Sequence, residues 1–88
     1  VLGTIPYMAP EQAVDSKNVD QRTDVYGLGA VLYECLTGRT PHVGATPTNI
    51  LASLLRNDPP KPSELNKDLD PVLEAICLRA LARDPHER

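Results

Sequence analysis

The stretch DVYGLGAVLYECLTG, from Asp24 to Gly38, determines how the rest of the chain must be arranged. Between Val25 and Leu36 the only strongly polar side chain is Glu34, whereas a surface helix carries polar residues along one side. A helix with this pattern must be buried on most of its circumference. Because a chain of 88 residues supplies only some of the necessary partners, we expect part of the surroundings to lie outside these residues.

Two glycines, Gly27 and Gly29, lie near the beginning of this stretch. An interior glycine costs a helix about 1 kcal/mol relative to alanine, so we expect another backbone to approach closely there. Asp20 is a suitable N-cap, and Gly38 is suited to end the helix. The pattern therefore predicts a central buried helix over 21–38.

The composition is typical of one small globular unit, with 41% apolar residues and no Phe or Trp. The formal net charge of -3 and the lack of a basic stripe argue against nucleic acid as a partner. Cys35 and Cys77 lie in apolar helical patterns without CxxC spacing, which predicts buried thiols in a reducing compartment, not a metal site or disulfide. No signal peptide is visible, and no apolar run reaches the roughly 20 residues that span a bilayer.

Two further helices are predicted after the central one. Thr46 and Asp70 each stand before a proline, and a cap followed by a first-turn proline is typical of a helix start. Apolar residues then recur at helical spacing along one face. We expect one-sided helices over 46–57 and 70–83, packed beside the central helix. The proline-bearing segment 61–69 between them is predicted to be an extended surface linker.

The two ends of the sequence differ from this regular part. Gly3, Pro6 and Pro10 punctuate the first residues, which predicts an ordered irregular loop, with Pro10 opening a short helix. At the other end, DPHE at 84–87 has the form of a capping box that opens a new helix. We expect the chain to be a piece of a larger domain. No segment reads as a convincing strand, so the predicted fold class is all-α.

Three motifs carry a functional signal when they are considered together. GTIPYMAPE spans 3–11, DVYGLGAVLYECLTGRTP spans 24–41, and LRALARDPHER spans 78–88. In order and spacing they resemble the C-terminal lobe of the protein kinase family, of which A-P-E is a signature element. A lone APE would be weak, but the three motifs together are specific. GTxxY before APE resembles the serine/threonine branch, and YMAPEQ with LYECLTGR resembles bacterial eukaryotic-type kinases.

The resemblance implies that residues 1–88 are a helical fragment of a kinase C-terminal lobe, whose parent domain is α+β. Residues 1–20 would form the substrate-docking loop and APE segment. The parent would transfer the γ-phosphate of ATP to Ser or Thr of proteins, with Mg as the metal. The Gly-rich loop, the Lys–Glu pair, the catalytic Asp and Asn and the DFG motif are not among these residues. The resemblance therefore implies no catalytic, ATP-binding or metal-binding residue in the fragment.

Within the first motif the resemblance implies three substrate-binding residues, Thr4, Pro6 and Tyr7. Thr4 matches a hydroxyl that supports the catalytic loop and helps to position the acceptor. A turn-stabilising hydroxyl is the alternative for Thr4. Met8 fits either the wall of the docking site or simple packing under the loop. Ile5 departs from the family pattern, in which proline is common.

Four structural residues follow from the resemblance as well. Glu11 and Arg88 match a buried ion pair that ties the loop to the end of the lobe, and the alternative is two solvated charges. Asp24 matches a buried aspartate that accepts hydrogen bonds from the catalytic loop, and the alternative is an acid favoured by the helix dipole. Gly29 matches a point of close approach by a neighbouring segment, and the alternative is simply a weak helix position. His42 stands where the family has an aromatic residue, and it has no nucleophile or acid nearby in sequence.

Three functions are compatible with these residues: a fragment of an active kinase, a pseudokinase or scaffold lobe that only binds partners, and a free-standing helical interaction module. The third is disfavoured by the incomplete capping box and the apolar helix. Intact HRDxxxxN and DFG motifs upstream would separate the first two. The expected partners are protein substrates and the rest of the kinase domain, with a cytoplasmic location, on the kinase side of the membrane if an anchor lies outside these residues.

Overall fold

The computed structural model describes residues 2–15, 17 and 19–88, and the side chains of residues 2–4 are not among the parts described. All regular elements in these residues are helical, and no strand occurs among them, which confirms the predicted all-α class. Along the chain they are the 3-10 helix η1 (Leu2–Tyr7), α1 (Pro10–Val14), α2 (Gln21–Thr37), α3 (Pro47–Arg56), α4 (Pro62–Leu65), α5 (Pro71–Ala80) and the 3-10 helix η2 (Pro85–Glu87).

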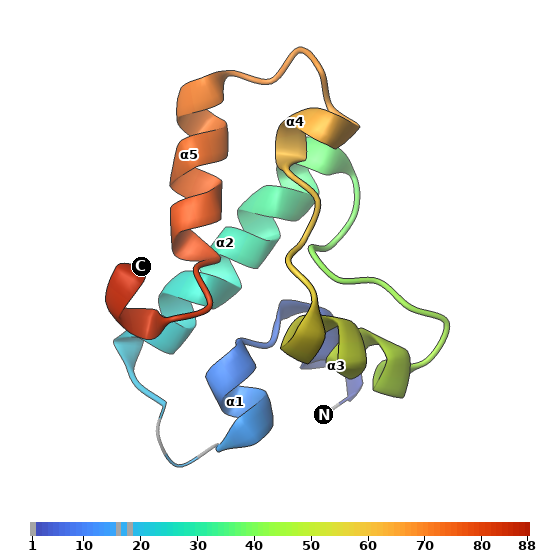
Figure 1. Ribbon diagram of the computed structural model, residues 1–88, viewed down its shortest axis with the longest axis vertical. Helices are drawn as coiled ribbons and strands as arrows, with labels where there is room; N and C mark the ends of the chain where they lie inside the picture. The colour runs from blue at the N-terminus through green and yellow to red at the C-terminus, as the bar shows by residue number, and fades with distance from the viewer. Residues whose placement is uncertain (1, 16, 18) are drawn as a thin grey trace.

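The long helix α2 runs through the middle of the molecule, and the other elements are arranged around it (Figure 1). α5 and α4 pack against it, while η1 and the C-terminal η2 contact it as well. Its start is fixed by Asp20, whose carboxylate accepts a hydrogen bond from the Arg22 amide at 2.8 Å. Its end is fixed by Gly38 in the left-handed region at φ 84°. Both predicted caps are therefore present, and each satisfies backbone groups that a helix end would otherwise leave without partners.

α2 is buried on one face only, which corrects the prediction of burial around most of its circumference. Tyr26, Ala30 and Tyr33 lie in the core and are at most 2% exposed. On the opposite face Leu28 is 71% exposed and Val31 is 47% exposed. The helix is apolar on both faces, but the described part of the chain covers only one of them.

The close approach expected at the two glycines occurs at Gly29, where the end of α5 crosses α2, and not at Gly27, whose Cβ would lie 3.9 Å from the Tyr7 carbonyl oxygen. A Cβ on Gly29 would lie 2.7 Å from the Ala80 Cβ and 3.3 Å from Leu81 Cδ2. Beside this contact the buried Cys77 thiol faces the Gly29 carbonyl, with the sulfur 3.6 Å from the oxygen. The prediction of two buried thiols is wrong for Cys35, which is exposed because it lies on the uncovered face of α2.

The two flanking helices begin where their caps predict. The Thr46 hydroxyl accepts from the Asn49 amide at 3.1 Å, and the Asp70 carboxylate accepts from the Val72 amide at 2.8 Å. The predicted end at 83 is too late for α5, which stops at Ala80. The chain turns there and leads into η2, which brings the C-terminal residues back toward the start of α2 (Figure 1).

Two segments predicted to be irregular are helical. The first residues form the 3-10 helix η1 with Pro6 inside it, because the fixed φ of proline is compatible with a short helical turn. The predicted extended linker 61–69 contains α4, which begins with the buried Pro62. This segment is held to α2, since the Asn66 side chain donates to the Leu36 carbonyl at 3.0 Å.

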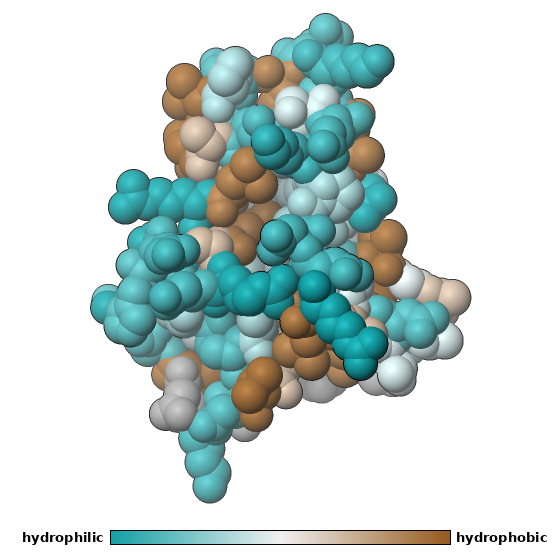
Figure 2. Space-filling model, viewed as in Figure 1, coloured by the Kyte–Doolittle hydropathy of each residue, from teal (hydrophilic) through white to brown (hydrophobic). Residues whose placement is uncertain are grey.

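The core joins residues from all parts of the fold. Its buried members come from the first turns, α2, α3 and the end of α5: Ala9, Tyr26, Ala30, Tyr33, Leu54, Cys77 and Leu81. Apolar side chains also remain on the surface over α5 (Figure 2), where Val72 is 64% exposed and Ile76 is 55% exposed. Among the described residues, none of the helices combines the length and the apolar character that a membrane crossing requires.

Candidate functional site

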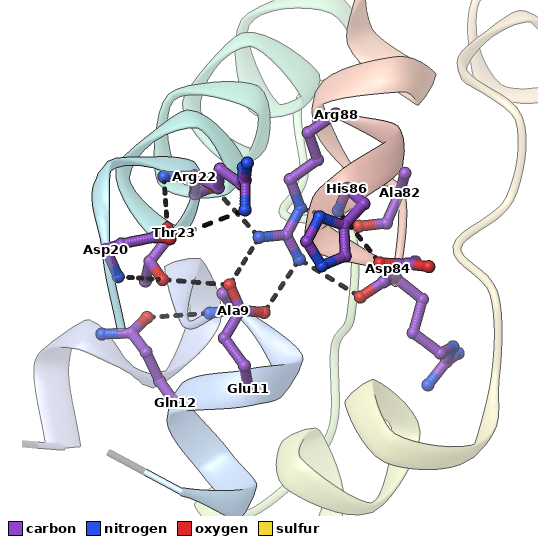
Figure 3. A network of polar contacts seen from close by, with 11 residues as sticks. Ala9, Glu11, Gln12, Asp20, Arg22, Thr23, Ala82, Asp84, His86 and Arg88 are labelled. Carbon is purple, nitrogen blue, oxygen red and sulfur yellow. Dashed lines mark hydrogen bonds and ion pairs between the residues drawn. The ribbon is translucent and has the colours of Figure 1, made fainter. Parts of the chain in front are cut away.

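Arg88 is the centre of a polar network that ties the two ends of the chain together (Figure 3). Its side chain is only 1% exposed. One guanidinium nitrogen, Nη1, lies 2.5 Å from Glu11 Oε2, and the other, Nη2, donates to Glu11 Oε1 at 2.9 Å. This two-pronged arrangement is the strong geometry for an arginine–carboxylate pair. The structure therefore brings Glu11 and Arg88 together from opposite ends of the sequence.

The remaining donors of Arg88 bind backbone carbonyls. Nε donates to the Ala82 carbonyl at 2.8 Å, Nη1 donates to that of Arg22 at 3.0 Å, and Nη2 donates to that of Arg83 at 3.4 Å. The guanidinium also lies 5.0 Å from the centre of the Tyr26 ring, within the range of a cation–π contact. Burying a charge is costly unless it is paired and hydrogen-bonded, and this site meets both conditions.

Glu11 has a second partner that the sequence reasoning missed. The buried Thr23 hydroxyl donates to Glu11 Oε2 at 3.0 Å and accepts from the Asp20 amide at 3.3 Å. Burial alone would raise the pKa of the Glu11 carboxyl, but hydrogen bonds from Arg88, the backbone and Thr23 hold it below its ordinary value. The capping box of α2 was a usable signal, because it places Thr23 three residues after the cap.

The segment that precedes α1 is attached to the last turn of α2 by Tyr7. Its hydroxyl donates to Glu34 Oε1 at 2.8 Å, and this hydrogen bond with the carboxylate raises the pKa of Tyr7. Glu34 is the strongly polar exception in the apolar pattern of α2, so the bond gives that residue a role that the sequence reasoning missed. Pro6, Tyr7 and Met8 are all half-buried at this position.

The structure treats the other predicted site residues differently. The Thr4 side chain lies outside the described residues. Asp24 is exposed in this chain, so its predicted burial is not found, because the described residues leave that side of α2 uncovered. Gly29 lies at the crossing of α2 and α5 and admits the Ala80 backbone and side chain.

His42 is buried, with 5% of its surface exposed. Its Nδ1 lies 2.7 Å from the Ser53 hydroxyl oxygen, which joins the loop after α2 to α3. Burial lowers the pKa of the ring, and the positive charge of Arg83 lowers it further. The imidazole thus fills the place predicted for an aromatic side chain as a neutral, hydrogen-bonded ring.

The described residues offer no fitted site for a nucleotide or a metal ion. No group of three or more His, Cys, Asp or Glu residues in this part of the chain is arranged to hold a metal ion. The same part encloses no pocket. The chemistry that these residues support is the attachment of one segment to another through charge-assisted hydrogen bonds.

Comparison with known proteins places the chain among protein kinases. The family model described as "Protein kinase domain" matches residues 1–88. The chain is 47% identical over its whole length to serine/threonine-protein kinase PknB of Mycolicibacterium smegmatis and 44% identical to that of Mycobacterium leprae. It is 42% identical to a probable serine/threonine-protein kinase of Streptomyces coelicolor. The chain spans 14% of the length of the two PknB proteins and 13% of the Streptomyces protein.

Proposed function

Because the chain belongs to the protein kinase domain family, we propose that the full-length protein carrying it transfers the γ-phosphate of ATP to serine or threonine residues of proteins. The match covers all 88 residues, and relatives named serine/threonine-protein kinases are 42% to 47% identical over that length. In this proposal the present residues support acceptor docking and the scaffold. ATP and Mg bind elsewhere in the same domain, as phosphoryl transfer by this family requires.

The observation that carries the docking role is the double attachment of the first residues. Glu11 is fixed to the C-terminal end by the two-pronged pair with Arg88. Tyr7 is fixed to α2 by its hydrogen bond to Glu34. The segment that carries Tyr7 and leads to Glu11 is therefore held to α2 at one point and to Arg88 at another. Such a fixed segment suits the placement of an acceptor peptide, because catalysis depends on holding the reacting groups in position.

The proposed partners are protein acceptors and the remainder of the kinase domain. A cytoplasmic location is proposed as well, on the kinase side of the membrane if the full-length protein has an anchor. Cys35 and Cys77 are both free, which is the usual state of thiols in a reducing compartment.

The direct test is phosphate transfer by the full-length protein with ATP, Mg and matched acceptor peptides that carry Ser, Thr or Tyr. We expect transfer to Ser and Thr, and no transfer by the isolated 88-residue chain. A full-length protein that binds its acceptors without transferring phosphate would contradict the proposal and favour the pseudokinase alternative. Transfer by the isolated chain would contradict the assignment of catalysis to residues outside it.

Replacing Thr4 tests the role that the resemblance assigns to this residue. In the full-length protein, Thr4→Ala should lower kcat by on the order of 10²-fold, because a lost positioning contact misplaces the reacting groups. Nucleotide affinity should change little. Thr4→Ser, which keeps the hydroxyl, is the control and should retain most of the activity. An unchanged kcat for Thr4→Ala would show that the residue only stabilises the turn.

A further inference from the structure

Helix α3 ends without the usual local stop. The last four carbonyls of a helix lack intrahelical donors, and a left-handed residue, usually glycine, commonly satisfies some of them. Here the residue after the helix, Asn57, is extended at φ -118° and ψ 149°. Pro59 and Pro60 follow soon after, and proline has no backbone N–H to donate. The Ser53 carbonyl accepts from the Asn57 amide at 2.8 Å, and the carbonyls after it are left to donors from outside the helix or to water.

Arg83 supplies that donor from the turn beyond α5. Its Nη1 donates to the carbonyls of Leu54 and Leu55, each at 3.0 Å. Its Nη2 donates to the carbonyl of Asn57 at 2.9 Å, with Asp58 Oδ1 at 3.4 Å. The charge is also favourable, because the C-terminal end of a helix carries partial negative charge. One guanidinium thus closes the end of a helix that lies about one-third of the chain away.

The end of α3 is connected to the segment in front of α1. The Leu54 side chain is 2% exposed and belongs to the same core cluster as Ala9. Tyr7 and Met8 pack against this cluster, and α3 as a whole packs against η1 and α1. Leu54, one of the residues whose carbonyls Arg83 binds, thus also belongs to the core cluster against which Tyr7 and Met8 pack.

The backbone of Arg83 is held in turn by the polar network of the site. Arg88 donates to the Arg83 carbonyl at 3.4 Å and to the Ala82 carbonyl at 2.8 Å, while it binds Glu11. Arg88 thus holds the turn that carries Arg83 and also binds Glu11 in α1. The residues from Ala82 to Arg88 therefore connect the start of α1 with the end of α3.

We infer that Arg83 is a positioning residue, which closes the end of α3 and thereby sets the place of the segment from Ile5 to Ala9. The inference rests on the proposed function, in which this segment docks the protein acceptor. The planar guanidinium is needed because its several donors point in fixed directions and reach separate carbonyls. A lysine would supply the same charge as a single compact ammonium.

The first arm of the test measures kinetics of the full-length protein with Arg83→Gln and Arg83→Lys. Both should raise KM for a Ser/Thr acceptor peptide, with a loss of kcat/KM of up to about 10²-fold, and leave KM for ATP unchanged. Arg79→Gln is the matched control, because it removes an exposed arginine from the last turn of α5 and should behave as wild type. Asp58→Asn should also resemble wild type, since the Asp58 side chain is 93% exposed and the carbonyls are the main acceptors.

The second arm measures amide hydrogen exchange and does not depend on activity. In Arg83→Gln, exchange should become faster in α3 and in residues 5–9, while α5 keeps its protection. Unchanged exchange in both segments, or a KM for ATP that rises as much as that for the acceptor, would overturn the inference. So would an Asp58→Asn variant that reproduces the Arg83→Gln defect. If the wild-type protein transfers no phosphate, the proposed function fails, and the exchange pattern still decides the role of Arg83.

Discussion

Glu11 and Arg88 show how a single pair of residues closes this fold. Each charge would be costly to bury alone, and Arg88 is far more buried than Glu11, at 1% against 15% exposed for the two side chains. The guanidinium is satisfied from all sides by Glu11, three backbone carbonyls and the Tyr26 ring. The pair therefore holds α1 to the C-terminal end of the chain, and removing one partner would leave the other charge without compensation.

Removing the charge of Glu11 should therefore destabilise the fold. We predict that Glu11→Gln lowers the free energy of unfolding of the full-length kinase domain by roughly 3 kcal/mol, because Arg88 would remain buried without its counter-charge. Urea unfolding measures this change. Arg22→Gln is the control: its pair with Asp20 spans 3.8 Å, and the two side chains are 46% and 56% exposed. Such an exposed pair is worth about 1 kcal/mol or less. Equal effects of the two variants would contradict the assignment of Arg88 as the buried anchor.

His42 should make the stability of the domain depend on pH. Its pKa in the folded protein lies below the ordinary value of 6.5, so on acidification the unfolded chain binds the proton first. The stability due to the neutral ring is fully present above pH 6.5 and is lost as the pH falls through the lower folded pKa. Arg83 and Arg39 oppose protonation, and Asp58 favours it.

The measurement is urea unfolding of the full-length protein over the range below pH 6.5, the ordinary pKa of His42. We expect the wild type to lose stability more steeply on acidification than His42→Phe, which keeps an aromatic ring without a titratable nitrogen. His86→Gln, at an exposed histidine, should follow the wild type. Parallel curves for wild type and His42→Phe would show that His42 does not titrate differently in the two states.

At the scale of the helices, the crossing of α2 and α5 depends on the absence of a side chain at Gly29. A Cβ there would lie 2.7 Å from the Ala80 Cβ, which cannot move aside without its backbone. Gly29→Ala should therefore destabilise the domain by about 1–3 kcal/mol, the usual cost of overpacking. Gly27→Ala is the matched control, because the nearest atom to its Cβ would be 3.9 Å away. It should be neutral or stabilise by up to about 1 kcal/mol, through helix propensity. Thermal unfolding of both variants measures the difference, and a stable Gly29→Ala would contradict the tight crossing.

The same scale shows what the sequence could predict and why. The caps Asp20, Thr46 and Asp70 and the stop at Gly38 were predictable, because each acts on backbone groups within a few residues. The helix α4 was not predicted, because it is stabilised by the burial of Pro62 and by Asn66, whose hydrogen-bond partner, the Leu36 carbonyl, is distant in sequence.

In the candidate site, too, the contacts between residues distant in sequence could not be predicted from local rules. The contact of Glu11 with Arg88 was expected only through the family motifs, since no local rule joins residues 77 positions apart. The Tyr7–Glu34 bond and the capping of α3 by Arg83 were not expected, because they depend on which helices cross. The docking roles of Thr4, Pro6 and Tyr7 stay predictions.

The molecule as a whole leaves apolar surface that the described residues do not cover. Leu28 and Val31 are exposed on α2, and Val72 and Ile76 are exposed on α5. Small soluble proteins rarely expose several large aliphatic side chains on neighbouring helices, because contiguous apolar patches promote association. In the proposed full-length kinase, other parts of the domain would cover the outer face of α2.

We therefore predict that the isolated chain of 88 residues self-associates in a concentration-dependent way, measurable by sedimentation velocity. The driving force is burial of aliphatic side chains, each worth about 1.5–3 kcal/mol when fully removed from water. The double variant Leu28→Lys/Ile76→Lys should shift the isolated chain toward the monomer. In the full-length protein the same substitutions should lower stability, because Leu28 would then be buried. A matched double variant at exposed polar positions, Arg79→Lys/Lys67→Arg, should change neither property. A strictly monomeric wild-type chain, or a full-length protein that tolerates Leu28→Lys, would contradict the prediction, because it would show that the outer face of α2 faces solvent in the full-length protein.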